Sequence, residues 1–192
     1  MVKESVYYLK PEEITRLITF APSLRDRVII KILARTGMRR AELRDIDIED
    51  IDFEKRRIHI KSGKGKKPRT VPVDIDTLQD IKFLIGSRKE GKLITTTKSG
   101  NKTVSLKQIN EIVAKCGKLA GIKHPNPAKK NINPHLLRHS FARNARAKGM
   151  PIEILQQILG HKSIKTTIDV YGTPSMESVQ SEYEKRIAEM YK

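Results

Sequence analysis

Residues 133–139 read Asn-Pro-His-Leu-Leu-Arg-His, and this stretch determines how the second half of the chain is interpreted. Asn133 is a favourable helix N-cap, because its side chain can accept a hydrogen bond from the first helical turn. Pro134 suits the first helical position, where a missing N–H removes no helical hydrogen bond. We therefore predict a helix over residues 134–148.

This helix would carry His135, Arg138 and His139 on one face, since they are three and four residues apart. Paired histidines at this spacing occur in zinc sites, but the zinc proteases place a glutamate between them, whereas this chain has Leu-Leu-Arg. An arginine on the same face would repel a divalent cation. Arginine favours an oxyanion, because its planar fork can bind two phosphate oxygens. The alternative is that either histidine is a structural residue bonded to a carbonyl.

Downstream, a second helix is predicted to end at Gly160, which places His161 just beyond a helix C-terminus. Tyr171 follows in a third predicted helix, where Ile168 shares its face. A phenol near two histidines and an arginine could attack a phosphodiester. Taken singly, each of the five tyrosines could equally be a packing residue.

The composition favours a nucleic-acid partner. Lys plus Arg outnumber Asp plus Glu by 39 to 22, giving a formal charge of +17. Trp is absent and aromatic residues make up 5% of the chain, so binding of a DNA duplex through its phosphates is favoured over base stacking. The lone Cys116 suits a reducing cytoplasm, and no apolar run approaches the roughly 20 residues of a membrane span.

The rest of the chain predicts a mainly α protein with a small antiparallel β-sheet, an α+β fold in one domain. Proline, glycine and serine positions mark four further helical segments, over residues 11–18, 22–36, 76–86 and 106–120. Gly37 is expected to end the second of these. Alternation of Ile58 and Ile60, then of Val71 and Val73, predicts a β-hairpin.

The tip of this hairpin, residues 62–68, contains two glycines and three lysines. Residues 55–69 contain basic residues and no acidic residue, whereas residues 41–54 are strongly acidic. A lysine-bearing hairpin tip can reach into a DNA groove, although a solvated loop that is basic by chance is an equal alternative.

Together these motifs resemble the catalytic domain of the tyrosine site-specific recombinases, the lambda-type integrase and Xer family. The motifs, in order, are Thr-Gly-Met-Arg-Arg-Ala-Glu-Leu at 36–43, Gly-Lys-Gly at 63–65 leading to Arg-Thr-Val-Pro-Val at 69–73, His-Leu-Leu-Arg-His at 135–139, Leu-Gly-His at 159–161, and Tyr171. The richness in Lys and Ile would suit an archaeal or thermophilic Xer-like enzyme.

The resemblance implies a role for each matching residue. Arg39 and Arg138 would hold the scissile phosphate, while Tyr171 attacks phosphorus and leaves a 3′-phosphotyrosyl link. The other implied roles are relay of the phenol proton by His135, protonation of the 5′-oxygen by Lys64, and a hydrogen bond to the phosphate from His161. No metal, ATP or other cofactor is implied. Arg40 competes with Arg39 for its role, as Lys66 and Lys67 compete with Lys64.

The remaining basic positions near these motifs are expected to contact DNA: Arg40, Lys61, Lys66, Lys67, Arg69, Lys129, Lys130 and Lys162. The resemblance also implies double-stranded DNA as partner and a tetramer on two duplexes. The alternative hypotheses for the function are a type IB topoisomerase and a catalytically silent DNA-binding protein of the same fold.

The expected organisation is a short leading segment (residues 1–10), a catalytic domain (11–174) and a C-terminal helix (175–192) that packs on its own domain or on a neighbour. The family's N-terminal DNA-binding domain is expected to be missing, so DNA binding should be weak and salt-sensitive.

Overall fold

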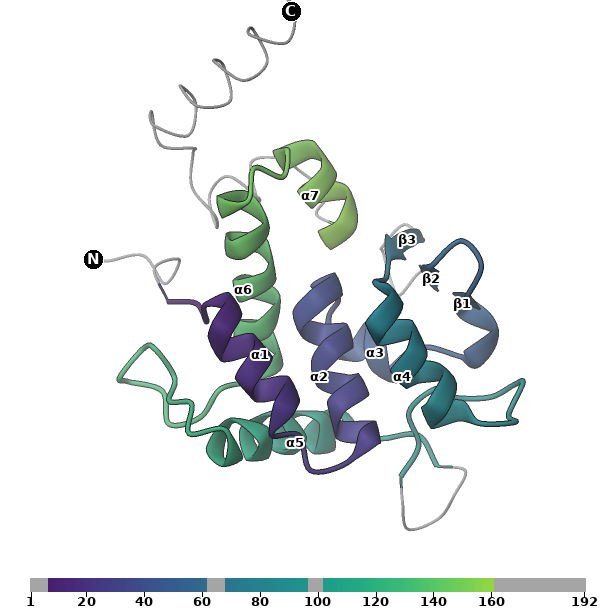
Figure 1. The fold of residues 1–192 in the computed structure, drawn as a ribbon, viewed down its shortest axis with the longest axis horizontal. Coiled ribbons are helices and arrows are strands. Elements are labelled where there is room, and N and C mark those ends of the chain that lie inside the picture. Colours follow the sequence, from purple (N-terminus) through teal and green to yellow (C-terminus); the bar gives the residue numbers. More distant parts are fainter. Residues whose placement is uncertain (1–6, 62–67, 97–101, 161–192) are drawn as a thin grey trace, which may run out of the picture.

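The computed structural model describes residues 7–61, 68–96 and 102–160. Over these residues the protein is mainly helical, with one small antiparallel sheet (Figure 1). The helices are α1 (Pro11–Thr19), α2 (Leu24–Thr36), α3 (Arg40–Asp45), the 3-10 turn η2 (Ile48–Asp50), α4 (Ile75–Ile85), α5 (Leu106–Leu119), α6 (Pro134–Ala147) and α7 (Ile152–Leu159). The predicted fold class is therefore confirmed.

Most helix ends follow the predicted capping signals. Asn133 accepts a hydrogen bond from Leu136 N–H at the start of α6, and Ser105 caps α5 in the same way. Gly37 ends α2 with a φ of 64°, the left-handed conformation typical of a helix stop. Pro22 was expected to open α2, but the N-cap is Ser23, whose side chain accepts from Asp26 N–H.

Helix α2 forms the centre of the fold, in contact with α1, α3, α4, α5 and α6. Figure 1 shows it standing between α1 and α4. Its side chains Ile29 and Ile30 are fully buried, as are Val28, Ile32 and Leu33. Nine of the thirteen α2 residues are buried, among them the charged Asp26 and Lys31, which agrees with the neighbouring helices that surround α2.

The sheet has three strands in the order β1 (Ile51–Asp52), β2 (Arg57–Ile60) and β3 (Arg69–Pro72). Strands β2 and β3 form the predicted hairpin, with Ile58 opposite Val71 and both side chains buried. The sequence missed β1, which is only two residues long and shows no alternation. The tip of the hairpin lies outside the described residues.

Two large apolar side chains on the helices, Phe83 and Leu119, are exposed. Phe83 of α4 is 76% exposed, because Leu78 and Ile81 already supply the face that this helix buries. Leu119, the last residue of α5, is 49% exposed. Leu93 and Ile94 are fully buried, and isolated β-bridges are formed by the flanking residues Lys92 and Thr95.

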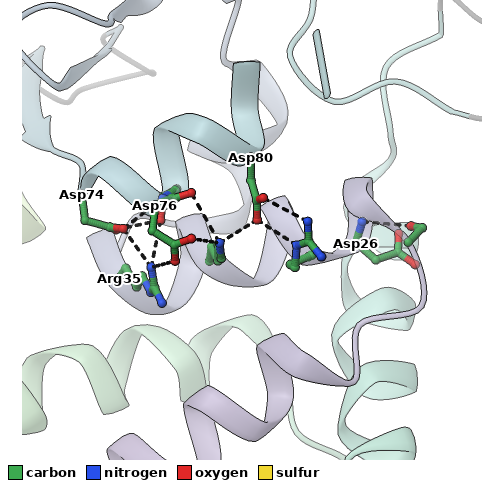
Figure 2. A network of polar contacts seen from close by, with 9 residues as sticks. Asp26, Arg35, Asp74, Asp76 and Asp80 are labelled. Carbon is green, nitrogen blue, oxygen red and sulfur yellow. Dashed lines mark hydrogen bonds and ion pairs between the residues drawn. The ribbon is translucent and has the colours of Figure 1, made fainter. Parts of the chain in front are cut away.

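A network of charged side chains joins α2 to α4 (Figure 2). Lys31 is almost fully buried, and its Nζ lies 2.6 Å from Asp80 and 2.8 Å from Asp76. Arg27 and Arg35 flank it, pairing with Asp80 and with Asp76 respectively. Burial alone would raise the pKa of Asp80, but hydrogen bonds from Arg27 and Lys31 lower it.

Replacing Asp80 with alanine is expected to lower the free energy of unfolding by about 3 kcal/mol, because the buried Lys31 ammonium loses its closest partner. Asp45→Ala is a suitable control: its ion pair with Arg44 is exposed, and such pairs contribute at most about 1 kcal/mol. Urea unfolding of the two variants measures both values. Equal losses would show that the buried network does not stabilise the contact between α2 and α4.

Within the part of the chain that the structure describes, no helix has the length and apolarity needed to cross a membrane.

Candidate active site

Arg138 lies almost fully buried inside α6, with 6% of its surface exposed. One guanidinium nitrogen donates to the carbonyl of Gly37, and Nη2 donates to the carbonyl of Leu159 at 2.8 Å. These two carbonyls stand at the C-terminal ends of α2 and α7, where backbone acceptors lack helical partners and the helix dipole is negative. The buried cation is therefore held by the ends of two helices.

Arg39 reaches the same place from the N-cap of α3. Its Nη1 lies 3.4 Å from the Leu159 carbonyl and 3.0 Å from Glu42 Oε1, and its side chain is 30% exposed. Arg39 and Arg138, which are far apart in the sequence, thus donate to a common carbonyl oxygen. The structure brings together the two arginines that the resemblance assigned to one phosphate.

Glu42 has a larger part in this site than the sequence suggested. Its side chain is 10% exposed and binds both Arg39 and Arg69. Burial would raise the pKa of Glu42, yet hydrogen bonds from Arg69 and from the backbone of Arg39, together with both guanidinium charges, lower it to about 2. The carboxylate is therefore ionised at neutral pH. The signal in the sequence was its position in the first turn of a helix, three residues after Arg39.

Arg69 was expected to contact DNA, and the structure gives it intramolecular partners. Its side chain is 10% exposed; Nη1 and Nη2 each lie 2.8 Å from a Glu42 oxygen, and Nε donates to the Ile158 carbonyl at 2.8 Å. A direct contact between Arg69 and DNA stays a prediction. What the structure shows is that Arg69 joins β3 to α3 and to the end of α7.

Two glycines allow this close packing. Gly37 and Gly160 both have a φ of 64°, which favours glycine on backbone grounds alone. A Cβ on Gly37 would lie 2.5 Å from Phe141 Cδ1, and one on Gly160 would lie 2.9 Å from Arg69 Cδ. The chain therefore turns sharply at both helix ends, directly against the side chains of Phe141 and Arg69.

The two histidines of α6 differ in exposure. His135 is exposed, whereas His139 is 8% exposed and His124, in the loop before α6, is 9% exposed. The exposed position suits the proton-relay role expected for His135, and the buried position suits a structural role for His139. Within the described residues, no group of three or more His, Cys, Asp and Glu side chains could hold a metal ion.

The other expected DNA-binding residues fall into three groups. Arg40, Lys129 and Lys130 are exposed. Lys61 is exposed but pairs with Asp47 at 2.8 Å and Asp50 at 3.0 Å, and hydrogen bonds to both raise its pKa. The expected site residues that lie outside the described part of the chain are Lys64, Lys66, Lys67, His161, Lys162 and Tyr171.

Residues 7–178 match the model of the phage integrase family. This match covers most of the chain, and it agrees with the fold and with the paired arginines. The chain belongs to the phage integrase family.

Among curated proteins, the chain is similar to tyrosine recombinase XerA of Pyrococcus furiosus, with 37% identity over 164 residues, or 83% of this chain and 54% of the relative. Tyrosine recombinase XerA of Pyrococcus horikoshii is 31% identical over 180 residues, or 92% of this chain and 60% of the relative. The chain thus spans little more than half the length of these relatives.

Solved structures of the same class share the fold. The crystal structure of XerA recombinase matches with a TM-score of 0.75 and 29% identity, over 93% of this chain and 64% of that one. XerH site-specific recombinase bound to its difH substrate matches with a TM-score of 0.75 and 25% identity, over 96% of this chain and 55% of that one.

Proposed function

We propose that this chain is the catalytic domain of a site-specific DNA recombinase, which cuts and rejoins duplex DNA through a 3′-phosphotyrosyl intermediate. The convergence of Arg39 and Arg138 on the Leu159 carbonyl is the observation that carries the proposal. Two guanidinium groups beside each other provide the positive charge and the hydrogen-bond donors that a phosphodiester requires. Leu159 also precedes His161 by only two residues, which supports a third donor close by.

In the proposed reaction, the Tyr171 oxygen forms a bond to phosphorus while the bond from phosphorus to the 5′-oxygen breaks. The phenol proton passes to His135, and Lys64 supplies a proton to the departing 5′-oxygen. Arg39 and Arg138 stabilise the charge on the non-bridging oxygens as the transition state forms. The phosphotyrosyl bond conserves the energy of the broken bond, so attack by a 5′-hydroxyl reverses the step without ATP.

The proposed partner is double-stranded DNA. The net charge of +17 favours a polyanion, and the XerH relative was solved bound to a DNA substrate. We further propose self-association on two duplexes, as the family resemblance implies, with residues 175–192 packing in cis or on a neighbour.

The proposed location is the cytoplasm. Burial raises the pKa of Cys116 to about 11, with the nearby Asp26 adding to the shift, so this thiol is protonated at neutral pH.

Tyr171→Phe should abolish covalent attachment to DNA, because it removes the attacking oxygen and little else. The substrates are nicked suicide duplexes with a randomised centre, which trap the intermediate whatever the target sequence is. Adducts are detected on a denaturing gel, with Tyr183→Phe as the chemically matched control. An adduct that persists in Tyr171→Phe would exclude Tyr171 as the nucleophile. A wild-type adduct would exclude a catalytically silent protein, and joining of two duplexes would separate a recombinase from a topoisomerase.

Lys64→Ala should slow cleavage by about 100-fold on an ordinary substrate, a typical loss for a missing general acid. Placing sulfur at the 5′-bridging position makes a leaving group that needs no proton, so cleavage by Lys64→Ala should recover on that substrate. Lys67→Ala is the comparison variant, since Lys67 is a competing lysine three positions further on, and the substrate distinguishes which of the two is the general acid. Failure to recover would overturn the general-acid role of Lys64.

A further inference from the structure

The Glu42 carboxylate is surrounded by donors from two arginines. Oε1 accepts from Arg39 Nη1 at 3.0 Å and from Arg69 Nη1 at 2.8 Å. Oε2 accepts from the Arg39 backbone N–H at 2.7 Å and from Arg69 Nη2 at 2.8 Å. Arg69 therefore forms a two-pronged pair with Glu42, while the Arg39 side chain contributes a single hydrogen bond from one nitrogen.

The pairing of Arg69 with Glu42 determines the net charge around Arg39. Arg39, Glu42 and Arg69 together carry a net charge of +1, so a phosphate near Arg39 meets a positive cluster. If Arg69 were removed, Arg39 would be the only arginine of this cluster left to pair with the buried Glu42 carboxylate. The net charge of the remaining pair would be zero. A desolvated carboxylate strongly favours a two-pronged arginine. Arg39 would then turn toward Glu42 and away from the phosphate.

The placement of Arg69 fits a fixed support better than a surface contact. Its Nε is held by the Ile158 carbonyl, and its side chain lies against Gly160, where a Cβ would approach within 2.9 Å of Nη1. Arg69 is thus anchored to α7 immediately before the Leu159 carbonyl that receives both Arg39 and Arg138. Its guanidinium can reach Glu42 without any movement of the sheet.

We propose that Arg69 is a positioning residue, which engages Glu42 so that Arg39 remains available to bind the scissile phosphate. The proposal rests on the proposed recombinase function for its role in cleavage. Its core, a competition between Arg69 and Arg39 for Glu42, concerns phosphate binding by the protein itself and can be tested separately.

The first test compares Arg69→Gln, Glu42→Gln and the double variant on a suicide duplex that the wild type has been shown to cleave, with DNA at saturation. Arg69→Gln should be about 100-fold slower, the cost of losing one phosphate donor. The double variant should be at least about tenfold faster than Arg69→Gln, because a neutral glutamine no longer captures Arg39. Removing the acid would also relieve any loss of stability caused by an unpaired buried carboxylate, so urea unfolding of each variant is measured beside its cleavage rate.

Two outcomes would overturn the proposal. A double variant that cleaves no faster than Arg69→Gln would show that Arg69 does not act through Glu42. Unchanged cleavage at saturation, with weaker DNA binding and a salt dependence reduced by about one phosphate contact, would make Arg69 a direct DNA ligand. Arg69→Lys serves if Arg69→Gln folds poorly: it keeps the charge but cannot make the two-pronged pair with Glu42, so its cleavage rate should fall between those of the wild type and Arg69→Gln.

The second test needs no catalysis. Inorganic phosphate is titrated into the full chain while the Nε–H signal of Arg39 is followed by NMR. Phosphate should bind Arg69→Gln about tenfold more weakly than wild type, and the double variant should recover. Equal phosphate affinity in the wild type and Arg69→Gln would refute the proposal. If the wild type forms no covalent adduct on any duplex, the proposed function fails, while this titration still decides the role of Arg69.

Discussion

Arg138→Ala is expected to reduce the single-turnover rate of DNA cleavage by roughly 1,000-fold, with little change in duplex affinity. Removal of one donor that stabilises transition-state charge costs about 100- to 1,000-fold, and Arg138 presents a two-pronged donor. The substitution also leaves the carbonyls of Gly37 and Leu159 without this partner, so the free energy of unfolding should fall by about 2 kcal/mol. Quenched-flow cleavage of a suicide duplex and urea unfolding measure the two effects.

Arg143→Ala provides the control for Arg138, because it removes an arginine from the same helix that lies 5.3 Å from the ring of Tyr8 instead. Its cleavage rate should stay within about threefold of wild type, as expected for a residue away from the reacting phosphate. Arg138→Lys keeps the charge but cannot span two carbonyls, so it should resemble Arg138→Ala. Full activity in Arg138→Lys would show that charge alone suffices.

Glu42→Gln is expected to remove a pH-dependent contribution to stability of roughly 3 kcal/mol. This is the free energy that corresponds to lowering the pKa of a buried carboxyl from its ordinary 4.5 to about 2. Because the pKa is lowered in the folded protein, this contribution is fully present above pH 4.5. It declines as the pH falls through 4.5 and is lost near pH 2. The free energy of unfolding of the wild type should therefore exceed that of the variant most at neutral pH. The difference should become smaller as the pH falls from 4.5 to 2.

Urea unfolding of both proteins between pH 7 and pH 2.5 measures that margin. Glu111→Gln is the control, since the Glu111 side chain is 60% exposed and its ion pair with Lys107 is long, at 3.9 Å. Its difference from wild type should stay below about 0.5 kcal/mol at each pH. A margin for Glu42→Gln that does not change with pH would show that the ion pairs of Glu42 do not stabilise the fold.

The sequence predicted those features that depend on neighbouring residues. Asn133 with Pro134 located the start of α6, and Gly37 and Gly160 located the ends of α2 and α7. Alternation located the hairpin, because successive strand residues face opposite sides of a sheet. Arg39 and Arg138 came from the family resemblance, and the structure places both at the Leu159 carbonyl.

The sequence did not predict features that depend on residues brought together by folding. Arg69 and Glu42 are 27 positions apart on different elements, and their pairing exists only once β3 packs beside α3. Similarly, a periodic pattern indicates that α4 has one buried face, but it cannot fix where that face ends, and Phe83 falls on the solvent side. Neither local capping nor periodicity contains this information.

The Leu159 carbonyl makes the arrangement of Arg39 and Arg138 depend on a helix that follows both of them in the chain. Both arginines are synthesised before α7 is complete, yet the acceptor that aligns them is the last residue of that helix. A chain still emerging from the ribosome, or one cut before α7, would carry the two cations without the oxygen that fixes their spacing. The proposed cleavage would therefore require α7 in place, and a chain that ends before Leu159 is expected not to cut DNA.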